Sequence, residues 1–320
     1  MKQSDAATGA NCLTIIVPVR NRAELVVRTL DSIAAASERP QRLVIVDNGS
    51  TDATLSVCRT WAEAHADMDI AVVQEPQAGA SRARNRGLRE VETEWVYFFD
   101  SDDDMDVSFV SDITQALPTV SSQIVFTPVC QEFKRHRMTR PYIVGGGAAE
   151  QILSSMFSTV TLIFRTAWLR KLGGWDEQLT TWDDWELGIR ALINKPAVDW
   201  MTRRAYHLIH VHAESQTGAS FTQTLDATLT AMRHAADDIA SAPLSTQEQM
   251  RCQRALYLRA QIMSGQLLRE GNATASHKYN ALASELLPEA GALLKLSGAF
   301  LRWYVHLGFR GAWRLALKML

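Results

Sequence analysis

The sequence Val96-Tyr97-Phe98-Phe99-Asp100-Ser101-Asp102-Asp103-Asp104 decides the fold, because an apolar run ends abruptly in four carboxylates within five residues. Val, Tyr and Phe favour a buried strand, and the acids follow where that strand leaves the core. Clustered carboxylates repel one another, and a hard divalent cation such as Mg²⁺ or Mn²⁺ offsets that cost when it bridges them to phosphate oxygens. An acidic surface turn after a core strand is the alternative interpretation, and the rest of the chain has to decide between the two.

Composition indicates a globular protein. The chain has 320 residues, of which 47% are hydrophobic, enough for one large or two ordinary domains. Lys and Arg (33) nearly balance Asp and Glu (35), so the net charge of −2 gives no reason to expect a nucleic-acid partner. The four cysteines lie far apart and match no zinc or redox spacing, which suits a reducing compartment.

The first eleven residues are polar and lack the apolar core of a signal peptide. No run in the chain approaches the ~18 apolar residues that a membrane span needs. We therefore expect a flexible N-terminus over residues 1–11 and a cytoplasmic protein.

Strands and helices alternate over the first hundred residues. Apolar runs at residues 13–19, 43–46 and 70–74 predict buried strands, and helical spacing follows each of them. The second of these helices is expected to run to Ala64, with Ser50 or Thr51 as its cap. Strands that are apolar on both faces and separated by helices predict an α/β fold with a mostly parallel central sheet flanked by helices.

Polar clusters follow three of the predicted strands. Arg20-Asn21, Asp47 and the acids from Asp100 to Asp103 all lie at carboxyl ends. In parallel sheets ligands bind beyond those ends, so three separate clusters are expected at one edge of the sheet. This convergence favours a binding site over a chance acidic turn.

Six short motifs, in this order and spacing, resemble the nucleotide-sugar-dependent glycosyltransferases of family 2, which have the Rossmann-like GT-A fold. They are Val-Pro-Val-Arg-Asn (17–21), Val-Asp-Asn-Gly-Ser-Thr-Asp (46–52), Gly-Ala-Ser-Arg-Ala-Arg-Asn-Arg-Gly (79–87), Phe-Asp-Ser-Asp-Asp (99–103), Gly-Gly-Trp-Asp-Glu (173–177) and Asp-Asp-Trp-Glu-Leu (183–187). The resemblance covers residues 13–215. It implies an inverting transferase that moves a sugar from a nucleoside diphosphate to an acceptor hydroxyl.

The resemblance also implies roles for the donor side of the site. Asp47 would accept a hydrogen bond from N3 of a uracil-type base, or else serve only to cap a turn. Arg84 would offset the diphosphate charge or hold the base. The remaining members of the implied nucleotide site are Pro18, Arg20, Asn21, Asp100 and Ser101.

Asp100 and Asp102 form the D-x-D pattern of the family. The resemblance places Asp100 near the ribose and makes Asp102 a ligand of Mn²⁺ or Mg²⁺, which carries charge on the departing nucleoside diphosphate. Asp103 either binds the metal directly or supports its ligands. His212, three residues before Ser215, is either a further metal ligand or a structural histidine.

The acceptor side is expected at the start of the helix that follows the Gly-Gly-Trp-Asp-Glu turn. Asp184 is predicted as the general base that takes the proton of the attacking hydroxyl. The family more often has Glu-Asp where this chain has Asp183-Asp184, so Asp183 remains an alternative base. In the other interpretation of Asp184, it has no catalytic role and only interacts with the helix dipole. Trp182 would stack on a sugar or pack, and Trp185 is predicted in the core.

Beyond residue 220 only helical patterns occur. We predict a glycosyltransferase domain over residues 12–220 and a helical C-terminal extension over residues 221–320, without an acid from Ala290 onward. In the last stretch cations recur every four residues among aromatic side chains, at Arg302, His306, Arg310, Arg314 and Lys318. This pattern predicts a helix on an anionic membrane surface, which would place the protein peripherally on the inner face, or a helix that docks on its own protein or on a homodimer partner.

The expected donor is a UDP-hexose, with GDP- and dTDP-sugars as alternatives, and the expected acceptor is a saccharide or a lipid-linked molecule. Such an enzyme would act in the synthesis of a cell-surface polysaccharide or glycan. Two rival functions remain. A sugar nucleotidyltransferase would carry a glycine-rich phosphate loop where this chain has residues 18–22, and a noncatalytic nucleotide-sugar-binding protein would bind without turnover.

Overall fold

The computed structural model describes residues 12–133, 136–210 and 220–320. Its contacts divide the chain into two compact units. The sheet unit comprises Met1–Arg140, Thr159–Glu177 and Ala197–His210, and the helical unit comprises Pro141–Ser158, Gln178–Pro196 and Val211–Leu320. The domain limits expected at residues 11 and 220 remain a prediction.

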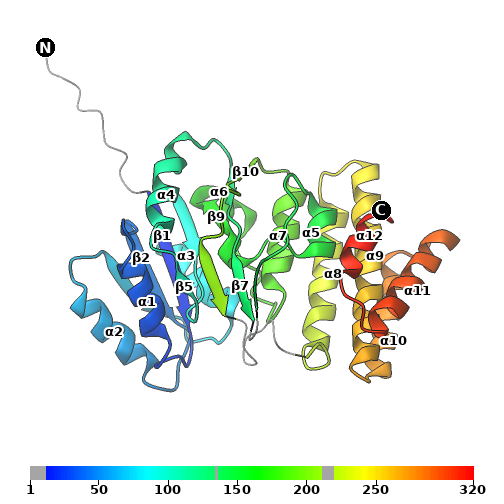
Figure 1. Cartoon of the computed structure of the whole chain (residues 1–320), viewed down its shortest axis with the longest axis horizontal. Helices are drawn as coiled ribbons and strands as arrows, with labels where there is room; N and C mark the ends of the chain where they lie inside the picture. Colours follow the sequence, from blue (N-terminus) through cyan, green and yellow to red (C-terminus); the bar gives the residue numbers. More distant parts are fainter. Residues whose placement is uncertain (1–11, 134–135, 211–219) are drawn as a thin grey trace, which may run out of the picture. The chain divides into compact units, whose positions relative to one another are not determined.

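The sheet unit is built on a seven-stranded sheet in the order β10-β6-β9-β4-β1-β2-β3. Strands β1 to β4 pair in parallel, as do β6 and β10, whereas β9 is antiparallel to both of its neighbours. The predicted mostly parallel sheet flanked by helices is therefore confirmed (Figure 1). The strands are β1 (Leu13–Val19), β2 (Arg42–Asp47), β3 (Ile70–Gln74), β4 (Trp95–Phe98), β6 (Ile124–Phe126), β9 (Leu162–Arg165) and β10 (Val198–Trp200).

Helices cover both faces of this sheet, because its strands are apolar on both sides. One face of β1, with Leu13, Ile15 and Val17, shares a core with α1 (Val26–Ala34), α2 (Thr54–Ala64) and α4 (Phe109–Ala116). Ile16 points to the other face, against α3 (Ala80–Arg89). A Cβ atom at Gly87 of α3 would come within 2.5 Å of Ile16 Cγ2, so glycine is what lets this helix approach the sheet.

A smaller sheet of the same unit has the order β5-β11-β7-β8. Strands β7 (Cys130–Phe133) and β8 (His136–Thr139) form an antiparallel hairpin. The other two are β5 (Asp104–Met105) and β11 (His207–His210). The short helices of this unit are α6 (Thr166–Leu172), η1 (Leu117–Thr119) and η2 (Thr159–Thr161).

The helical unit has a continuous apolar core formed by seven helices of the described chain. Ser245 caps the longest of them and forms a reciprocal capping box with Glu248. No described helix is both long enough and apolar enough to cross a bilayer. The helices are α5 (Ala148–Ser154), α7 (Asp183–Ile193), α8 (Leu225–Ser241), α9 (Thr246–Arg269), α10 (Ala273–Leu286), α11 (Ala292–His306) and α12 (Ala312–Leu317).

Candidate functional site

The carboxyl ends of β1, β2 and β4 meet at one edge of the large sheet. Val19 pairs with Asp47, the last residue of β2, and Ile16 pairs with Phe98, the last residue of β4. Asp100 follows Phe98 by only two positions, so the register brings the first two predicted clusters and the acidic turn to the same edge. Pro18 lies half-buried within β1, and Arg20 is exposed just beyond its end.

The loops after β1 and β2 are tied together by Asn21. Its backbone has φ 49°, a left-handed conformation that Asn tolerates better than most residues. The Asn21 N–H donates to Ser50 Oγ at 3.0 Å, and Asn21 Oδ1 accepts from the Thr51 N–H at 2.8 Å. The expectation that Ser50 or Thr51 caps α2 is wrong, because the helix begins only at Thr54, whose N–H donates to Asp52 at 3.0 Å.

Asp47 is held inside this edge, with its residue surface only 1% exposed. One carboxyl oxygen, Oδ2, accepts a long hydrogen bond of 3.4 Å from the Ser50 N–H. The other, Oδ1, is buried and has no hydrogen-bond partner among the described residues. A buried oxygen without a donor costs free energy, so this atom is a candidate acceptor for a ligand N–H.

The acidic turn is neutralised by arginines from the chain itself. Arg22 Nη2 lies 3.4 Å from Asp102 Oδ2, and Arg84 Nη2 donates to Asp100 Oδ1 at 3.3 Å. Arg28 forms an ion pair of 2.9 Å with Asp104. The sequence interpretation missed Arg22 and Arg28, since their partners lie more than seventy positions away.

Backbone contacts fix the course of the same turn. Arg28 Nη2 donates to the Asp102 carbonyl at 2.6 Å, and Thr29 Oγ1 donates to the Asp103 carbonyl at 2.9 Å. Asp103 and Ser101 are buried, whereas Asp100 and Asp102 keep part of their surface in solvent. Both acids of the D-x-D pattern are therefore accessible to a ligand.

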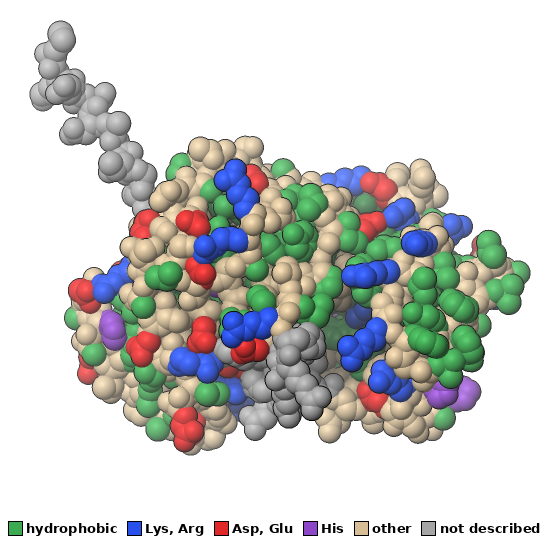
Figure 2. Space-filling model, viewed as in Figure 1, with side chains coloured by type: hydrophobic (Ala, Val, Ile, Leu, Met, Phe, Trp, Pro, Cys, Tyr) green, Lys and Arg blue, Asp and Glu red, His purple; other side chains and the backbone are tan. Residues whose placement is uncertain are grey.

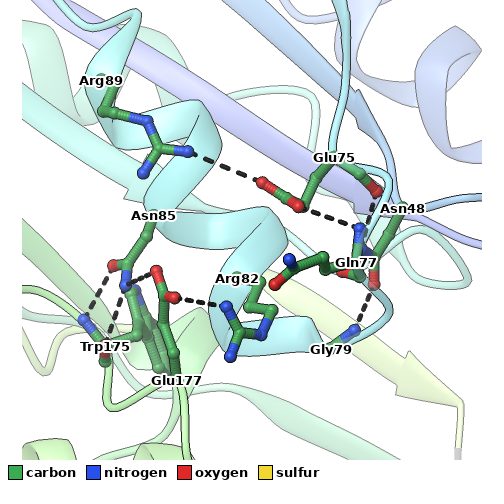
Figure 3. Close-up of polar contacts among 9 residues, drawn as sticks. All are labelled: Asn48, Glu75, Gln77, Gly79, Arg82, Asn85, Arg89, Trp175 and Glu177. Carbon is green, nitrogen blue, oxygen red and sulfur yellow. Dashed lines mark hydrogen bonds and ion pairs between the residues drawn. The ribbon is translucent and has the colours of Figure 1, made fainter.

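Arg84 rests on Trp175, with its guanidinium carbon 4.4 Å from the ring centroid. Asn85, the next residue of α3, makes three hydrogen bonds to the turn that carries this tryptophan. It accepts from the Trp175 N–H at 2.9 Å and donates to the Trp175 carbonyl at 2.8 Å and to Glu177 at 3.0 Å (Figure 3). Arg82 completes the contact with an ion pair of 2.8 Å to Glu177.

Asn48 fixes the start of α3. Its Nδ2 donates to the carbonyls of Glu75 and Gln77, at 3.2 and 2.8 Å, and its Oδ1 accepts from the Gly79 N–H at 2.8 Å (Figure 3). Gly79 has φ 153°, which favours glycine over any other residue. The sequence interpretation gave Asn48 no role beyond its place in the second motif.

In the helical unit, Trp182 precedes α7 with φ 59°. The Arg259 guanidinium lies 4.8 Å from its ring centroid, and Trp185, buried as predicted, packs 5.0 Å from it. Asp183 is buried and Asp184 half-buried in the first turn of α7, where a carboxylate interacts favourably with the helix dipole.

Two other titratable side chains, Glu186 and His207, are buried among side chains of the protein itself. Glu186 accepts two hydrogen bonds from Arg190, at 2.6 and 3.0 Å, while burial raises its pKa to about 7. His207 packs 4.3 Å from the ring of Phe109, and burial lowers its pKa to about 3. The predicted ligand His212 lies outside the described residues.

The donor atoms at the sheet edge suit a metal ion shared with a substrate. Among the described residues, no cluster of three or more His, Cys, Asp or Glu side chains can enclose a metal. Mg²⁺ is usually held by one or two carboxylates together with substrate phosphates and water. The partly exposed Asp100 and Asp102 of one turn supply that kind of incomplete oxygen donor set.

Curated relatives match only parts of the chain. Glycosyltransferase GlyA of Streptococcus pneumoniae is 33% identical over 112 residues, 35% of this chain and 16% of that protein. The teichoic acid poly(glycerol phosphate) polymerase of Staphylococcus epidermidis is 30% identical over 183 residues, 55% of this chain and 25% of that protein. The alignments thus cover well under half of these relatives.

Solved structures share the fold over most of the chain. S. aureus TarS 1–349 in complex with UDP superposes with a TM-score of 0.62 at 17% identity, over 89% of this chain and 90% of that one. The mannosyltransferase PcManGT of Pyrobaculum calidifontis, in complex with GDP-Man and Mn²⁺, gives a TM-score of 0.59 at 19% identity, over 96% and 83%.

The family model described as Glycosyl transferase family 2 matches residues 14–173, which is half of the chain. This match contains the three strand ends, the acidic turn and the whole of α3. The protein therefore belongs to glycosyl transferase family 2.

Proposed function

We propose that this protein is an inverting glycosyltransferase that moves a hexose from UDP to a hydroxyl of a saccharide or lipid-linked acceptor, in the synthesis of a cell-surface glycan. The observation that carries the proposal is the buried Oδ1 of Asp47, which has no hydrogen-bond partner in the described part of the chain and lies at the same sheet edge as Asp100, Asp102 and Arg84. Family membership and relatives named as glycosyltransferases support the reaction class.

The donor nucleotide would lie along this edge. Asp47 Oδ1 accepts the N3–H of uracil, which gives the buried oxygen the donor it lacks. Arg84, held by Trp175, carries positive charge towards the diphosphate, and Asp100 accepts from the ribose. The loops that include Pro18, Arg20, Asn21 and Ser101 line the rest of the nucleotide site.

Asp102 would hold the divalent cation, with Asp103 buried behind it and His212 as a further predicted ligand. A bound Mn²⁺ or Mg²⁺ supplies Lewis-acid stabilisation of the charge on the leaving diphosphate. The complex of the structural relative PcManGT contains Mn²⁺, which supports a metal of this kind.

Asp184 would take the proton of the acceptor hydroxyl, with Asp183 as the alternative base. An aspartate is a weak base for an alcohol, so proton transfer has to accompany bond formation at the anomeric carbon. Trp182 already has the Arg259 guanidinium over its ring, so an acceptor sugar would stack only on the ring surface that Arg259 leaves open.

The nucleotide part of the proposal is tested by calorimetric titration of UDP in the presence of Mn²⁺. The Asp47→Asn variant is expected to bind UDP at least about tenfold more weakly, because the amide presents no anionic acceptor to N3–H. Asp69→Asn is the matched control, since Asp69 precedes β3 at the opposite edge of the sheet and pairs with Arg42. Equal UDP affinity in wild type and Asp47→Asn would contradict the assigned role.

The chemical step is tested separately by transfer assays with a panel of nucleotide sugars. Asp184→Asn is expected to lower turnover by roughly 10²–10⁴-fold with unchanged UDP affinity. If Asp183→Asn shows that loss instead, Asp183 is the base. If neither substitution alters turnover, the acid pair has no catalytic role.

The two rival functions give different products in the same assays. A nucleotidyltransferase would release pyrophosphate from a nucleoside triphosphate and a sugar 1-phosphate, whereas the proposed enzyme releases UDP. A noncatalytic binding protein would take up the nucleotide sugar and release neither.

A further inference from the structure

The outer face of α11 carries an unusual concentration of exposed hydrophobic side chains. Six of the ten large hydrophobic residues that are exposed in the described chain lie between residues 293 and 309. Leu293 is 79% exposed, Leu296 68% and Trp303 55%. Figure 2 shows hydrophobic side chains gathered over the C-terminal helices, with Lys and Arg side chains beside them.

Five of these six residues form one continuous stripe. They follow each other at intervals of three and four, which places them on a single side of the helix. We call them the α11 stripe: Leu293, Leu296, Phe300, Trp303 and Leu307. A stripe of this regularity in a soluble helix is normally buried against a partner.

The opposite face of α11 already has its partner within the helical unit. Leu301 and Val305 are buried, and a Cβ atom at Gly298 would come within 2.8 Å of the Tyr257 ring of α9. The α11 stripe is therefore not the face that docks on the chain's own core. The sequence left three outcomes for this helix: a membrane surface, its own protein or a homodimer partner. Docking on its own protein describes the inner face alone.

The chain after α11 extends the stripe in a defined conformation. Gly308 and Gly311, with φ 89° and 80°, end α11 and start α12. Tyr304 stacks on Phe309 at 4.9 Å and its hydroxyl donates to the Arg310 carbonyl at 3.1 Å. Phe309, itself exposed, is thus held in a defined turn directly after the stripe.

The charges beside the stripe are all of one sign. No Asp or Glu occurs from Ala290 to Leu320, and the cations Lys295, Arg302, Arg310, Arg314 and Lys318 all lie in this segment. Lys295, Arg302 and His306 follow each other at seven and four positions, so they share one flank of the helix next to the stripe. Among the described residues, none of the five Lys and Arg side chains is joined to an acid by an ion pair.

We propose that the α11 stripe and its basic flank form a membrane-docking surface that lies on an anionic lipid bilayer. Leu, Phe and Trp side chains enter the boundary between headgroups and acyl chains, while Lys and Arg contact the lipid phosphates. This inference does not depend on the proposed transferase reaction, because every residue that carries it belongs to the helical unit.

Charge argues for lipid and against a second copy of the chain. Two copies that met through this face would bring two acid-free basic segments together, and neither would supply a carboxylate to the other. Anionic lipid headgroups supply the missing negative charge and accept the apolar stripe at the same time. The occupant to which the proposal commits is therefore an anionic membrane surface.

Co-sedimentation of the full chain with vesicles tests the proposal. Vesicles of phosphatidylcholine mixed with phosphatidylglycerol are expected to bind the protein at least about tenfold more strongly than vesicles of phosphatidylcholine alone. Combined Leu296→Ser, Phe300→Ser and Trp303→Ser substitutions are expected to remove most of this binding. Because these side chains are exposed, circular dichroism and UDP affinity should remain as in wild type.

A second variant separates charge from apolar contact. Lys295→Gln with Arg310→Gln is expected to weaken binding to the anionic vesicles by about tenfold, and to reduce its dependence on salt. The matched control for the triple serine variant is Val144→Ser with Met250→Ser. It removes two exposed hydrophobic residues elsewhere in the helical unit and is expected to bind anionic vesicles as wild type does.

Three outcomes would overturn the proposal. The first is a wild-type chain that does not sediment with anionic vesicles, and the second is equal binding by the triple serine variant. The third is a wild-type dimer that the serine substitutions convert to a monomer in analytical ultracentrifugation, without any vesicle binding, which would assign the stripe to a second copy. A wild-type protein that binds the vesicles but shows no transferase activity would count against the proposed function and not against this surface.

Discussion

Replacing Asn85 with Ala is expected to lower the free energy of unfolding of the sheet unit by more than the loss of a single surface contact of α3 would. The Asn85 side chain satisfies both the N–H and the carbonyl of Trp175, at 2.9 and 2.8 Å, and also donates to Glu177. Trp175 is buried, so its backbone groups have little access to water once the amide is removed. The turn that supports Arg84 would lose its attachment to α3.

The magnitude follows from the two orphaned backbone groups. Each buried donor or acceptor left without a partner costs about 1–3 kcal/mol. Alanine returns about 0.5 kcal/mol, because it favours the helix more than Asn does. Water reaches part of the half-buried Asn85 position and lowers the cost further, so we expect a net loss of about 2–4 kcal/mol in the free energy of unfolding.

Urea unfolding followed by tryptophan fluorescence measures this loss. The matched control is Arg89→Ala on the same helix, because the exposed Arg89 makes only a 3.6 Å ion pair with Glu75 and should change stability by less than about 0.5 kcal/mol. Asn85→Asp is expected to destabilise at least as much as Asn85→Ala, because it loses both donors and turns a carboxylate oxygen towards Glu177 and the Trp175 carbonyl, which accept from the amide at 3.0 and 2.8 Å. If Asn85→Ala and Arg89→Ala were equally stable, the assignment of Asn85 as the residue that holds this turn would be wrong.

Further predictions concern the packing and titration of buried groups. Gly87→Ala should destabilise the protein to urea, because a clash with Ile16 of about 1–3 kcal/mol exceeds the roughly 1 kcal/mol that alanine adds to a helix. Glu186 has its pKa raised by burial from 4.5 to about 7, so the native state keeps a proton that the unfolded state loses, and the free energy of unfolding should fall as pH rises from about 4.5 to 7. Glu186→Gln should flatten that part of the urea-derived pH profile by about 1–3 kcal/mol. Burial raises the pKa of Cys58 to about 12 and of Cys252 to about 11, so a disulfide reagent should modify both thiols only after denaturation, as mass spectrometry of the labelled peptides would show.

The sequence predicted strand limits best where a continuous apolar run ends in polar residues. The runs at Leu13–Val19 and Ile70–Gln74 match β1 and β3 to the residue, although β1 is buried on both faces and β3 only partly buried. The antiparallel direction of β9 was not predicted, since an apolar run does not show which way a strand points. Strands of two or three residues, such as β5 and β10, carry too few side chains for any periodicity.

The sequence could predict where a candidate site residue lies when a strand end or a motif names it, but not when a distant partner completes the contact. Asp47 and Asp100 were predicted at the carboxyl ends of strands, and Arg84 was singled out by its motif; the roles assigned to them remain predictions. Asn48 was given no role of its own from the sequence, yet its amide determines where α3 starts through partners 27 to 31 positions away. Such pairings depend on strand order, which local sequence does not contain.

The structure changes the argument that the acidic turn needs a metal ion to offset the repulsion among its carboxylates. Clustered carboxylates do need an opposite charge, but Arg84, Arg22 and Arg28 already supply it to Asp100, Asp102 and Asp104. The acids therefore do not by themselves require a metal ion.

What favours an ion at Asp102 is the length of its contact with Arg22. The Arg22–Asp102 distance is 3.4 Å, longer than a close charge-assisted hydrogen bond, and Asp102 keeps 19% of its side-chain surface exposed, so a ligand can reach it. A cation that replaces Arg22 at Asp102 would leave this guanidinium at the same sheet edge, where a diphosphate can accept its hydrogen bonds. In the proposed function, the metal ion takes the place of Arg22 at Asp102, and Arg22 then contacts the diphosphate. Metal binding and phosphate binding are therefore coupled, and each should strengthen the other.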